Sequence, residues 1–159
     1  MTARLNYIQA SPDTFKKYQA FSQAAHAGSI EASLFDLVQI RASQLNGCAF
    51  CVDMHVKEAT IRGERALRLH HVAVWHDSPL FSDRERAALY WTETLTRLPE
   101  GGISDETYNK VAPYFSETEM TDLSFAIIVI NGWNRLSVGF AAVPGSADAI
   151  YGLDKAGLS

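Results

Sequence analysis

The chain has 159 residues, a formal net charge of -4, 47% hydrophobic residues and 20% charged residues. This length fits one domain, and the ordinary globular balance excludes a disordered or fibrous protein. The negative charge argues against a nucleic-acid or anionic-membrane partner, because both require a basic patch. No apolar run approaches the roughly 18 residues of a membrane span. Residues 1–7 lack a signal-like apolar stretch, so we expect a cytoplasmic protein.

The first half of the chain predicts two long helices joined by a short turn. Ser11 is a suitable N-cap before Pro12, and this helix is expected to end near residue 26. Ser29 is expected to cap the second helix, which Asn46-Gly47 ends. Its apolar residues recur at helical spacing: Leu34, Leu37, Val38 and Leu45.

Three further helices are predicted before residue 99. One starts at the cysteines and runs over about 48–62, and a short one covers 64–74. Ser82 and Glu85 have the spacing of a capping box, in which the two residues satisfy each other's backbone N–H groups. The helix that follows has a predicted buried stripe of Ala88, Trp91, Leu95 and Leu98.

The last predicted helices follow a proline- and glycine-rich loop. Ser104 is expected to cap a short helix that ends near Pro113, and Ser116 with Glu119 forms a second capping box. The segment 123–130 that follows is apolar on all faces, as in a buried central helix or a subunit interface. We prefer a helix to a strand, because a capping box precedes the segment and no other strand candidate exists.

The predicted fold is therefore all-α: one helical bundle of about six to seven helices, with the cysteines at a helix N-terminus. We assign residues 1–145 to this domain and residues 146–159 to a C-terminal tail. The tail follows Pro144-Gly145 and has little periodicity, so we expect it to be loosely docked or disordered.

The two cysteines, Cys48 and Cys51, form a C-x-x-C followed by His55. Two cysteines cannot make the disulfide framework of a secreted domain, and in a reducing compartment such a pair is typically catalytic, redox-active or metal-binding. On a helix, spacings of three and four residues place all three side chains on one face. The helix N-terminus favours thiolate over thiol, most strongly at Cys48. The spacing to His55, which can accept a proton, favours Cys51 as the nucleophile.

A histidine that acts as a base needs an orienting carboxylate. Glu58 lies three residues after His55, but we interpret it as an exposed helix residue. Asp36, on the preceding helix, would differ from His55 in height by about 4–5 Å if the two helices form an antiparallel hairpin. We therefore expect Asp36 to contact His55 directly or through a water.

The stretch from Asp36 to His55 resembles the core motif of the AhpD-like alkylhydroperoxidases, in the carboxymuconolactone decarboxylase superfamily. That motif is a glutamate, eleven residues and then C-x-x-C-x-x-x-H. Segments 85–92 and 130–136 are similar to the peroxidase-related branch, so the resemblance spans roughly residues 30–140. It implies the family's helical fold and a homo-oligomer, a trimer or hexamer.

Carried over to this chain, the resemblance implies that Cys51 attacks the peroxide and that Cys48 resolves the resulting sulfenic acid into a Cys48–Cys51 disulfide. His55 would belong to the proton relay. The motif's glutamate falls on Asp36, whose side chain is one methylene shorter, and Phe50 stands where some members carry a histidine.

We interpret the chain as a thiol-dependent peroxidase of small hydroperoxides that uses Cys51, Cys48, His55 and Asp36. No flavin, haem or nucleotide motif is visible, so we expect no cofactor and a thiol or protein as reductant. The alternatives are a dithiol adaptor that reduces a partner protein, a lactone-acid decarboxylase with Arg41 or Arg135 as carboxylate ligand, and a non-catalytic oligomeric module.

Several other side chains are given structural roles. A zinc site at the two cysteines and His55 is disfavoured, because no second Cys/His pair follows. Trp91 and Trp133 are expected in the core or at an interface. Asn131 and Asn134 need buried partners on an apolar helix, so we expect them to fix a subunit contact rather than to bind substrate. A site is disfavoured at His70, His71 and His76, because adjacent histidines point to different sides of a helix.

Overall fold

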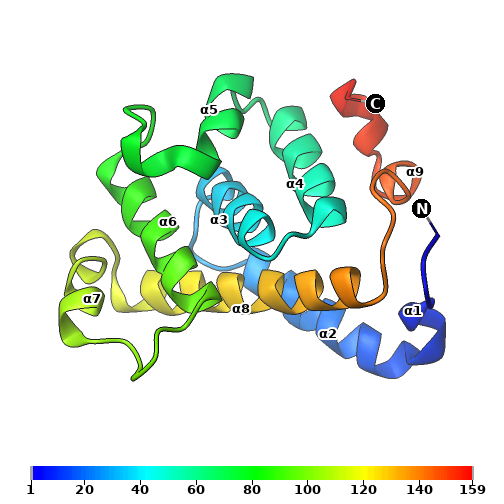
Figure 1. Ribbon diagram of the computed structural model, residues 1–159, viewed down its shortest axis with the longest axis horizontal. Helices are drawn as coiled ribbons and strands as arrows, with labels where there is room; N and C mark the ends of the chain where they lie inside the picture. Colours follow the sequence, from blue (N-terminus) through cyan, green and yellow to red (C-terminus); the bar gives the residue numbers. More distant parts are fainter. Residues whose placement is uncertain (1, 159) are drawn as a thin grey trace.

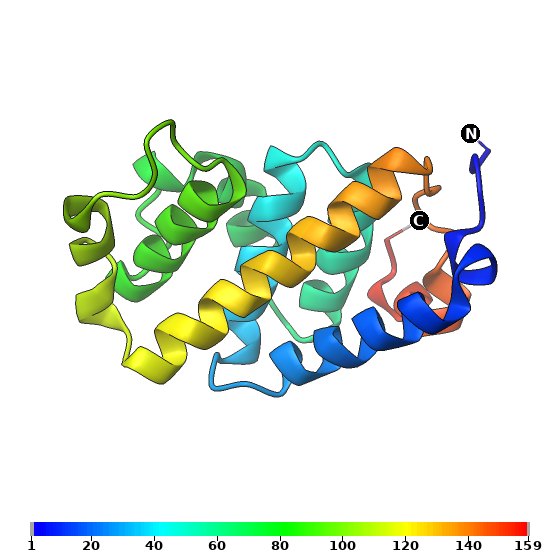
Figure 2. The same cartoon turned by 90° about the horizontal axis from the view of Figure 1, so that it is seen from below.

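The computed structural model describes residues 2–158, and within this range it contains helices and no strands, which confirms the predicted all-α class. Both termini lie at the same end of the molecule (Figures 1 and 2). The elements are α1 (Tyr7–Ala10), α2 (Pro12–His26), α3 (Ala32–Leu45), α4 (Ala49–Ile61), α5 (Ala66–His71), the 3₁₀ helix η1 (Val72–Asp77), α6 (Asp83–Thr96), α7 (Asp105–Asn109), η2 (Ala112–Tyr114), α8 (Glu117–Gly139), α9 (Asp148–Tyr151) and η3 (Leu153–Ala156).

Local sequence signals fix most helix starts where they were predicted. Pro12 opens α2, and the capping boxes of Ser82 and Ser116 are both formed, each with its glutamate bonded back to the N-cap backbone. Ser104 caps α7 through the backbone N–H of Thr107. The partners in each of these caps lie within one helical turn, so these caps could be recognised from the sequence alone.

Two predicted details, the cap of α3 and the last residue of the buried stripe on α6, are wrong. Ser29 does not cap α3, which starts after Glu31, since both the N–H and the hydroxyl of Ser29 donate to Asp122 at 2.8 and 2.7 Å. Leu98 is not part of a buried stripe, because α6 ends before it and its side chain is 67% exposed.

The central helix of the bundle is α3. Every residue from 34 to 40 is buried, since α4, α6 and α8 pack around this helix (Figures 1 and 2). The helix α8 instead runs along one side, and its Phe125 and Ile128 are 43% and 51% exposed. The apolar segment 123–130 is therefore helical as predicted, but it is not enclosed on all faces within one chain.

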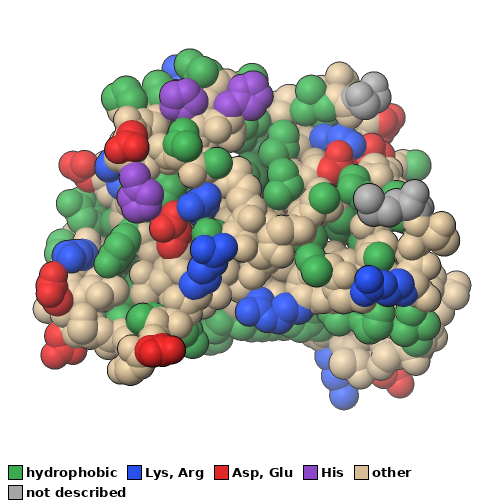
Figure 3. All heavy atoms as spheres, viewed as in Figure 1, with side chains coloured by type: hydrophobic (Ala, Val, Ile, Leu, Met, Phe, Trp, Pro, Cys, Tyr) green, Lys and Arg blue, Asp and Glu red, His purple; other side chains and the backbone are tan. Residues whose placement is uncertain are grey.

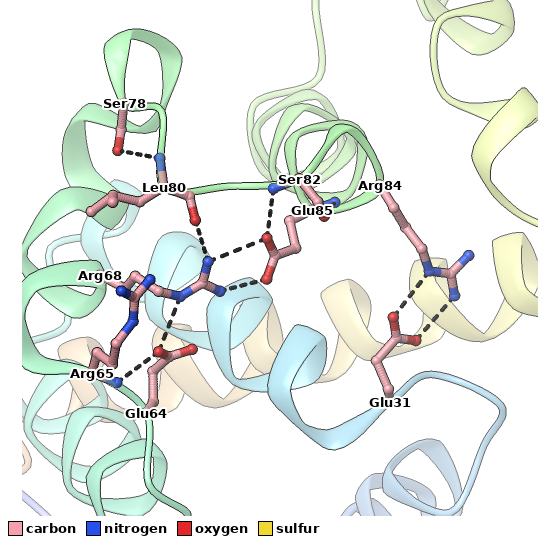
Figure 4. Close-up of polar contacts among 9 residues, drawn as sticks. All are labelled: Glu31, Glu64, Arg65, Arg68, Ser78, Leu80, Ser82, Arg84 and Glu85. Carbon is pink, nitrogen blue, oxygen red and sulfur yellow. Dashed lines mark hydrogen bonds and ion pairs between the residues drawn. The ribbon is translucent and has the colours of Figure 1, made fainter.

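Ion pairs join α5, α6 and the start of α3 (Figure 4). Arg68 on α5 binds both Glu64 and Glu85, which joins α5 to the start of α6. Arg84 on α6 makes a two-point contact of 3.0 Å with Glu31 at the start of α3. These contacts hold α3 in place without taking part in the site described below.

The C-terminal segment is folded onto the bundle, which corrects the expectation of a loosely docked or disordered tail. It forms α9 and η3, and Leu153 is only 2% exposed where η3 packs against α4. Lys57 on α4 is buried and bridges Asp53 and Asp148 at 2.9 and 2.7 Å. These carboxylates raise the pKa of Lys57, so the buried ammonium stays charged and ties the segment to α4.

Candidate active site

The cysteine pair lies at the start of α4, as predicted. Gly47 has a φ of +64°, a left-handed conformation that suits glycine, and it turns the chain from α3 into α4. Cys48 is the N-cap, and its sulfur accepts a hydrogen bond from the backbone N–H of Cys51 at 3.2 Å. The two residues form a disulfide with a Cα–Cα distance of 5.3 Å. The site is therefore able to hold an oxidised dithiol without rearranging the helix.

A polar network clamps the turn that carries the cysteines. The Asn46 amide donates to the side-chain oxygens of Asn131 and Asn134 on α8, at 3.0 and 2.9 Å. Asn134 is fully buried and donates in turn to Ser43 on α3. The two asparagines of α8 thus have partners inside this chain, where they fix the α3–α4 turn against α8.

His55 is held by Glu58 rather than by Asp36. Its Nδ1 lies 2.7 Å from Glu58 Oε2, so Nδ1–H donates to the carboxylate and Nε2 is left free to exchange a proton. The Glu58 side chain is 27% exposed, which corrects its interpretation as an exposed residue. Burial alone would raise the pKa of Glu58, but the hydrogen bond and charge of His55, together with Arg62, hold it below its usual value. Glu58 therefore remains a carboxylate that orients the imidazole.

Asp36 is buried beside this pair and is bound to Arg62. The Arg62 Nε donates to Asp36 Oδ2 at 2.8 Å, and a second guanidinium nitrogen lies 3.9 Å from Glu58. Asp36 thus reaches His55 through Arg62 and Glu58, and no direct hydrogen bond joins Asp36 to His55 within residues 2–158. Burial raises the pKa of Asp36, while the Arg62 guanidinium opposes that shift.

A cavity of about 750 Å³ opens beside the disulfide. Cys51, His55 and Glu58 line it, whereas Cys48 does not. Most of the wall is apolar and comes from segments far apart in sequence. The main apolar and aromatic lining residues are Tyr7, Ile8, Phe15, Phe50, Met54, Trp133, Val143, Ile150 and Tyr151.

Two polar residues in this wall were not foreseen as site residues. Gln39 on α3 is 2% exposed, and its amide nitrogen lies 3.4 Å from Nε2 of His26 at the end of α2. Sequence analysis used His26 only as a helix end. The signal that could have found Gln39 is a polar residue inside a run that is otherwise suited to burial, one helical turn after Asp36.

The other candidates lie elsewhere. Figure 3 shows histidine side chains at the surface over α5 and η1. In this region the His71 ring contacts the Ser78 hydroxyl, and the His76 ring contacts the Glu93 carboxylate. Arg41 pairs with Glu93 and does not line the cavity, nor does Arg135. Within the described chain, no group of three or more His, Cys, Asp or Glu side chains is arranged to hold a metal, and no helix is long and apolar enough to span a membrane.

Residues 12–94 match the carboxymuconolactone decarboxylase family. The uncharacterized protein YdfG of Bacillus subtilis is 35% identical over 138 residues, which cover 87% of this chain and 94% of YdfG. The chain belongs to the carboxymuconolactone decarboxylase family. The uncharacterized protein YnjA of Escherichia coli is also 35% identical, over 65% of this chain and 54% of YnjA.

Solved structures place this member in the AhpD-like part of the superfamily. ATU0492 from Agrobacterium tumefaciens, a protein of unknown function suggested to be the antioxidant defence protein AhpD, superposes with a TM-score of 0.86 at 38% identity, covering 90% of this chain and 98% of ATU0492. An uncharacterized peroxidase-related protein from Ralstonia eutropha, with an alkylhydroperoxidase AhpD core, shares the fold at 18% identity, with a TM-score of 0.78 over 88% of this chain and 75% of its own. The debrominase Bmp8 does so at 19% identity, with a TM-score of 0.78 over 94% and 80%.

Proposed function

We propose that this protein is a thiol-dependent peroxidase that reduces organic hydroperoxides through a dithiol–disulfide cycle. The observation that carries the proposal is the position of Cys51: it lines an apolar cavity, its disulfide partner Cys48 does not, and His55 lies one helical turn away with its Nδ1 held by Glu58. The suggested antioxidant role of ATU0492 and the peroxidase-related name of the Ralstonia protein support the same chemistry.

In the proposed cycle, His55 Nε2 takes the proton of the Cys51 thiol. The thiolate attacks the terminal oxygen of R–O–O–H, the O–O bond breaks, and Cys51 becomes a sulfenic acid. The leaving alkoxide takes the proton from His55 and departs as the alcohol. The Cys48 thiol then attacks the sulfenic sulfur, which releases water and forms the disulfide seen in the structure.

The cycle needs a reductant but no further group from this chain. A small thiol or a dithiol protein would return two electrons and two protons to the disulfide by exchange. Because the disulfide opens toward the cavity at Cys51, we propose that the reductant attacks there. Asp36 is given a positioning role, since it holds Arg62 beside Glu58.

The wall of the cavity favours an organic hydroperoxide over hydrogen peroxide. An apolar cavity of this size gains little from a small hydrophilic ligand, whereas it can desolvate an alkyl or aryl body. We expect kcat/KM for an aromatic hydroperoxide such as cumene hydroperoxide to exceed that for hydrogen peroxide.

The test is a free-thiol count on reduced protein before and after one equivalent of cumene hydroperoxide. Wild type should lose two thiols and release one equivalent of alcohol. Cys48→Ser should accumulate a sulfenic acid at Cys51 that a dimedone-type reagent traps, and Cys51→Ser should consume no peroxide. Unchanged peroxide consumption in Cys51→Ser would remove the proposal.

The same experiment separates the alternatives. If wild type loses no thiols to any hydroperoxide yet exchanges readily with a disulfide protein, the chain is a dithiol adaptor. If neither reaction occurs, the result favours a cysteine-independent reaction of the superfamily or a non-catalytic module.

A further inference from the structure

Gln39 is an unusual residue for the centre of an apolar bundle. It belongs to the stretch 34–40 of α3 in which every side chain is buried, yet its amide lies in the wall of the cavity. Its nitrogen is engaged by His26, but its oxygen has no hydrogen-bond partner among residues 2–158. Among the described residues this oxygen is not one of the fully enclosed polar atoms that lack a partner, and the Gln39 side chain lines the cavity. A buried amide with an open acceptor points to a ligand that donates a hydrogen bond.

The orientation of this amide is fixed by His26. The His26 Nδ1 lies 2.8 Å from the backbone carbonyl of Ser22, and a carbonyl only accepts, so Nδ1 carries the proton. In the neutral ring Nε2 is then the acceptor, and the Gln39 side-chain N–H must donate to it. The His26 ring also rests on Phe35, with ring centroids 4.2 Å apart. The open oxygen of Gln39 is therefore a consequence of how His26 is held.

The position of Gln39 relative to the reactive sulfur follows from the α3–α4 hairpin. Gln39 lies seven residues before Asn46, and His55 lies eight residues after Gly47. At the rise of an α-helix the two differ in height by about 1.5 Å, and Cys51 differs from Gln39 by about 4–5 Å. Gln39 thus faces the cavity at the level of the Cys51–His55 turn, from the neighbouring helix.

We propose that Gln39 binds the hydroperoxide group of the substrate, with His26 as the residue that positions it. This inference rests on the proposed function. The terminal O–H of R–O–O–H donates to Gln39 Oε1, and Cys51 attacks that same oxygen from α4. The O–O bond breaks, the O–H stays on sulfur in the sulfenic acid, and His55 protonates the departing alkoxide. Gln39 neither gains nor loses a proton.

The subsite gives the site a preference for substrates with an O–H on the oxygen that is attacked. A disulfide has no such donor, so its reaction with Cys51 should not depend on Gln39. Cumene hydroperoxide and an aromatic disulfide reagent therefore form a matched pair of probes for the same sulfur.

The experiment measures both probes on reduced wild type, Gln39→Met, His26→Phe and His26→Gln. Gln39→Met keeps the shape but removes the acceptor, and kcat/KM for cumene hydroperoxide should fall about tenfold, the effect of one lost hydrogen bond. The rate with the disulfide reagent should stay within twofold. His26→Phe should resemble Gln39→Met, whereas His26→Gln restores an acceptor for the Gln39 amide and should recover most of the activity.

The possible failures are distinguishable. If wild type consumes no hydroperoxide, the proposed function fails and this inference fails with it. If wild type is active and Gln39→Met matches it, the peroxidase stands and the subsite is refuted. If Gln39→Met or His26→Phe slows both probes equally, the residues support the fold or the sulfur in general, and the substrate-binding role is likewise refuted.

Discussion

Replacing Gly132 with alanine should destabilise this protein, although alanine is the better helix former. Gly132 lies inside α8, where Tyr18 of α2 crosses it. A Cβ built at Gly132 would lie 1.9 Å from the Tyr18 hydroxyl oxygen and 2.7 Å from the ring carbon that bears it. The hydroxyl donates to the carbonyl of Val129 at 2.7 Å, and the Tyr18 ring meets Trp133 edge-on with centroids 4.5 Å apart. The methyl group would therefore push a well-fixed ring away from its partners.

The magnitude follows from three terms. Forcing an extra methyl into a packed contact costs about 1–3 kcal/mol. Loss of the Tyr18 hydrogen bond costs about 1 kcal/mol. The higher helix propensity of alanine offsets about 1 kcal/mol of this. The free energy of unfolding should fall by about 1–3 kcal/mol, which lowers Tm by about 2–4 °C per kcal/mol in a domain of this size.

Urea and thermal unfolding, followed by circular dichroism at a fixed protein concentration, measure this effect. Gly139 provides the matched control: it ends the same helix, and nothing lies within 4 Å of a Cβ built there, so Gly139→Ala should be neutral or stabilising by less than about 1 kcal/mol. In a Tyr18→Phe background the penalty at Gly132 should shrink, because the closest atom is gone. If Gly132→Ala and Gly139→Ala are equally stable, Tyr18 does not pack against Gly132 and the wall that α2 gives to the cavity is misplaced.

Three further predictions follow from other contacts. Burial, the largest single effect, raises the pKa of Glu58, but the hydrogen bond and charge of His55 together with the charge of Arg62 lower it by more, so the folded-state pKa lies below its usual value. The stability that Glu58 contributes is therefore present above about pH 4.5 and lost as the pH falls below it, and Glu58→Gln should lose less stability than wild type between about pH 5 and pH 3 in acid titrations of urea unfolding. Lys57→Met should free the C-terminal segment, seen as faster cleavage there under limited proteolysis, and an unchanged cleavage pattern would contradict the role of its ion pairs. We expect a second copy of the chain to cover the exposed Phe125 and Ile128, so changing both to glutamate should lower the mass measured by sedimentation; a wild-type monomer would contradict this.

The parts of the fold that were predictable depend on contacts within a single turn of helix. The two capping boxes and the start of α2 at Pro12 are examples, because their partners lie three or four residues away. The start of α3 was mispredicted, since Asp122, 93 residues further along the chain, engages Ser29. Apolar periodicity also could not tell which helix is central, because α3 is enclosed not only by the adjacent α4 but also by α6 and α8, which come much later in the chain.

The candidate site shows the same division. The C-x-x-C and His55 were found because their spacing within one helix determines which face they share. The choice of Asp36 over Glu58 as the partner of His55 assumed that the Asp36 carboxylate had no other partner. In the structure Arg62 binds Asp36, and His55 binds Glu58 instead. The buried position of Gln39 could be inferred from the sequence, but its open oxygen could not, because that depends on a contact with His26 at the end of another helix.

Under the proposed function, the reacting groups and part of the substrate-binding wall come from different parts of the chain. The Cys51 sulfur and the His55 imidazole lie on α4, inside the segment 12–94 that matches the family. The far wall of the cavity, by contrast, includes Ile8 of α1 and Ile150 of α9, which lie outside that segment. In the proposed cycle the reacting groups thus come from one helix, whereas part of the cavity wall comes from the two ends of the chain. Relatives that keep the motif but differ in these end segments should therefore keep the dithiol and change the substrate body that it reaches.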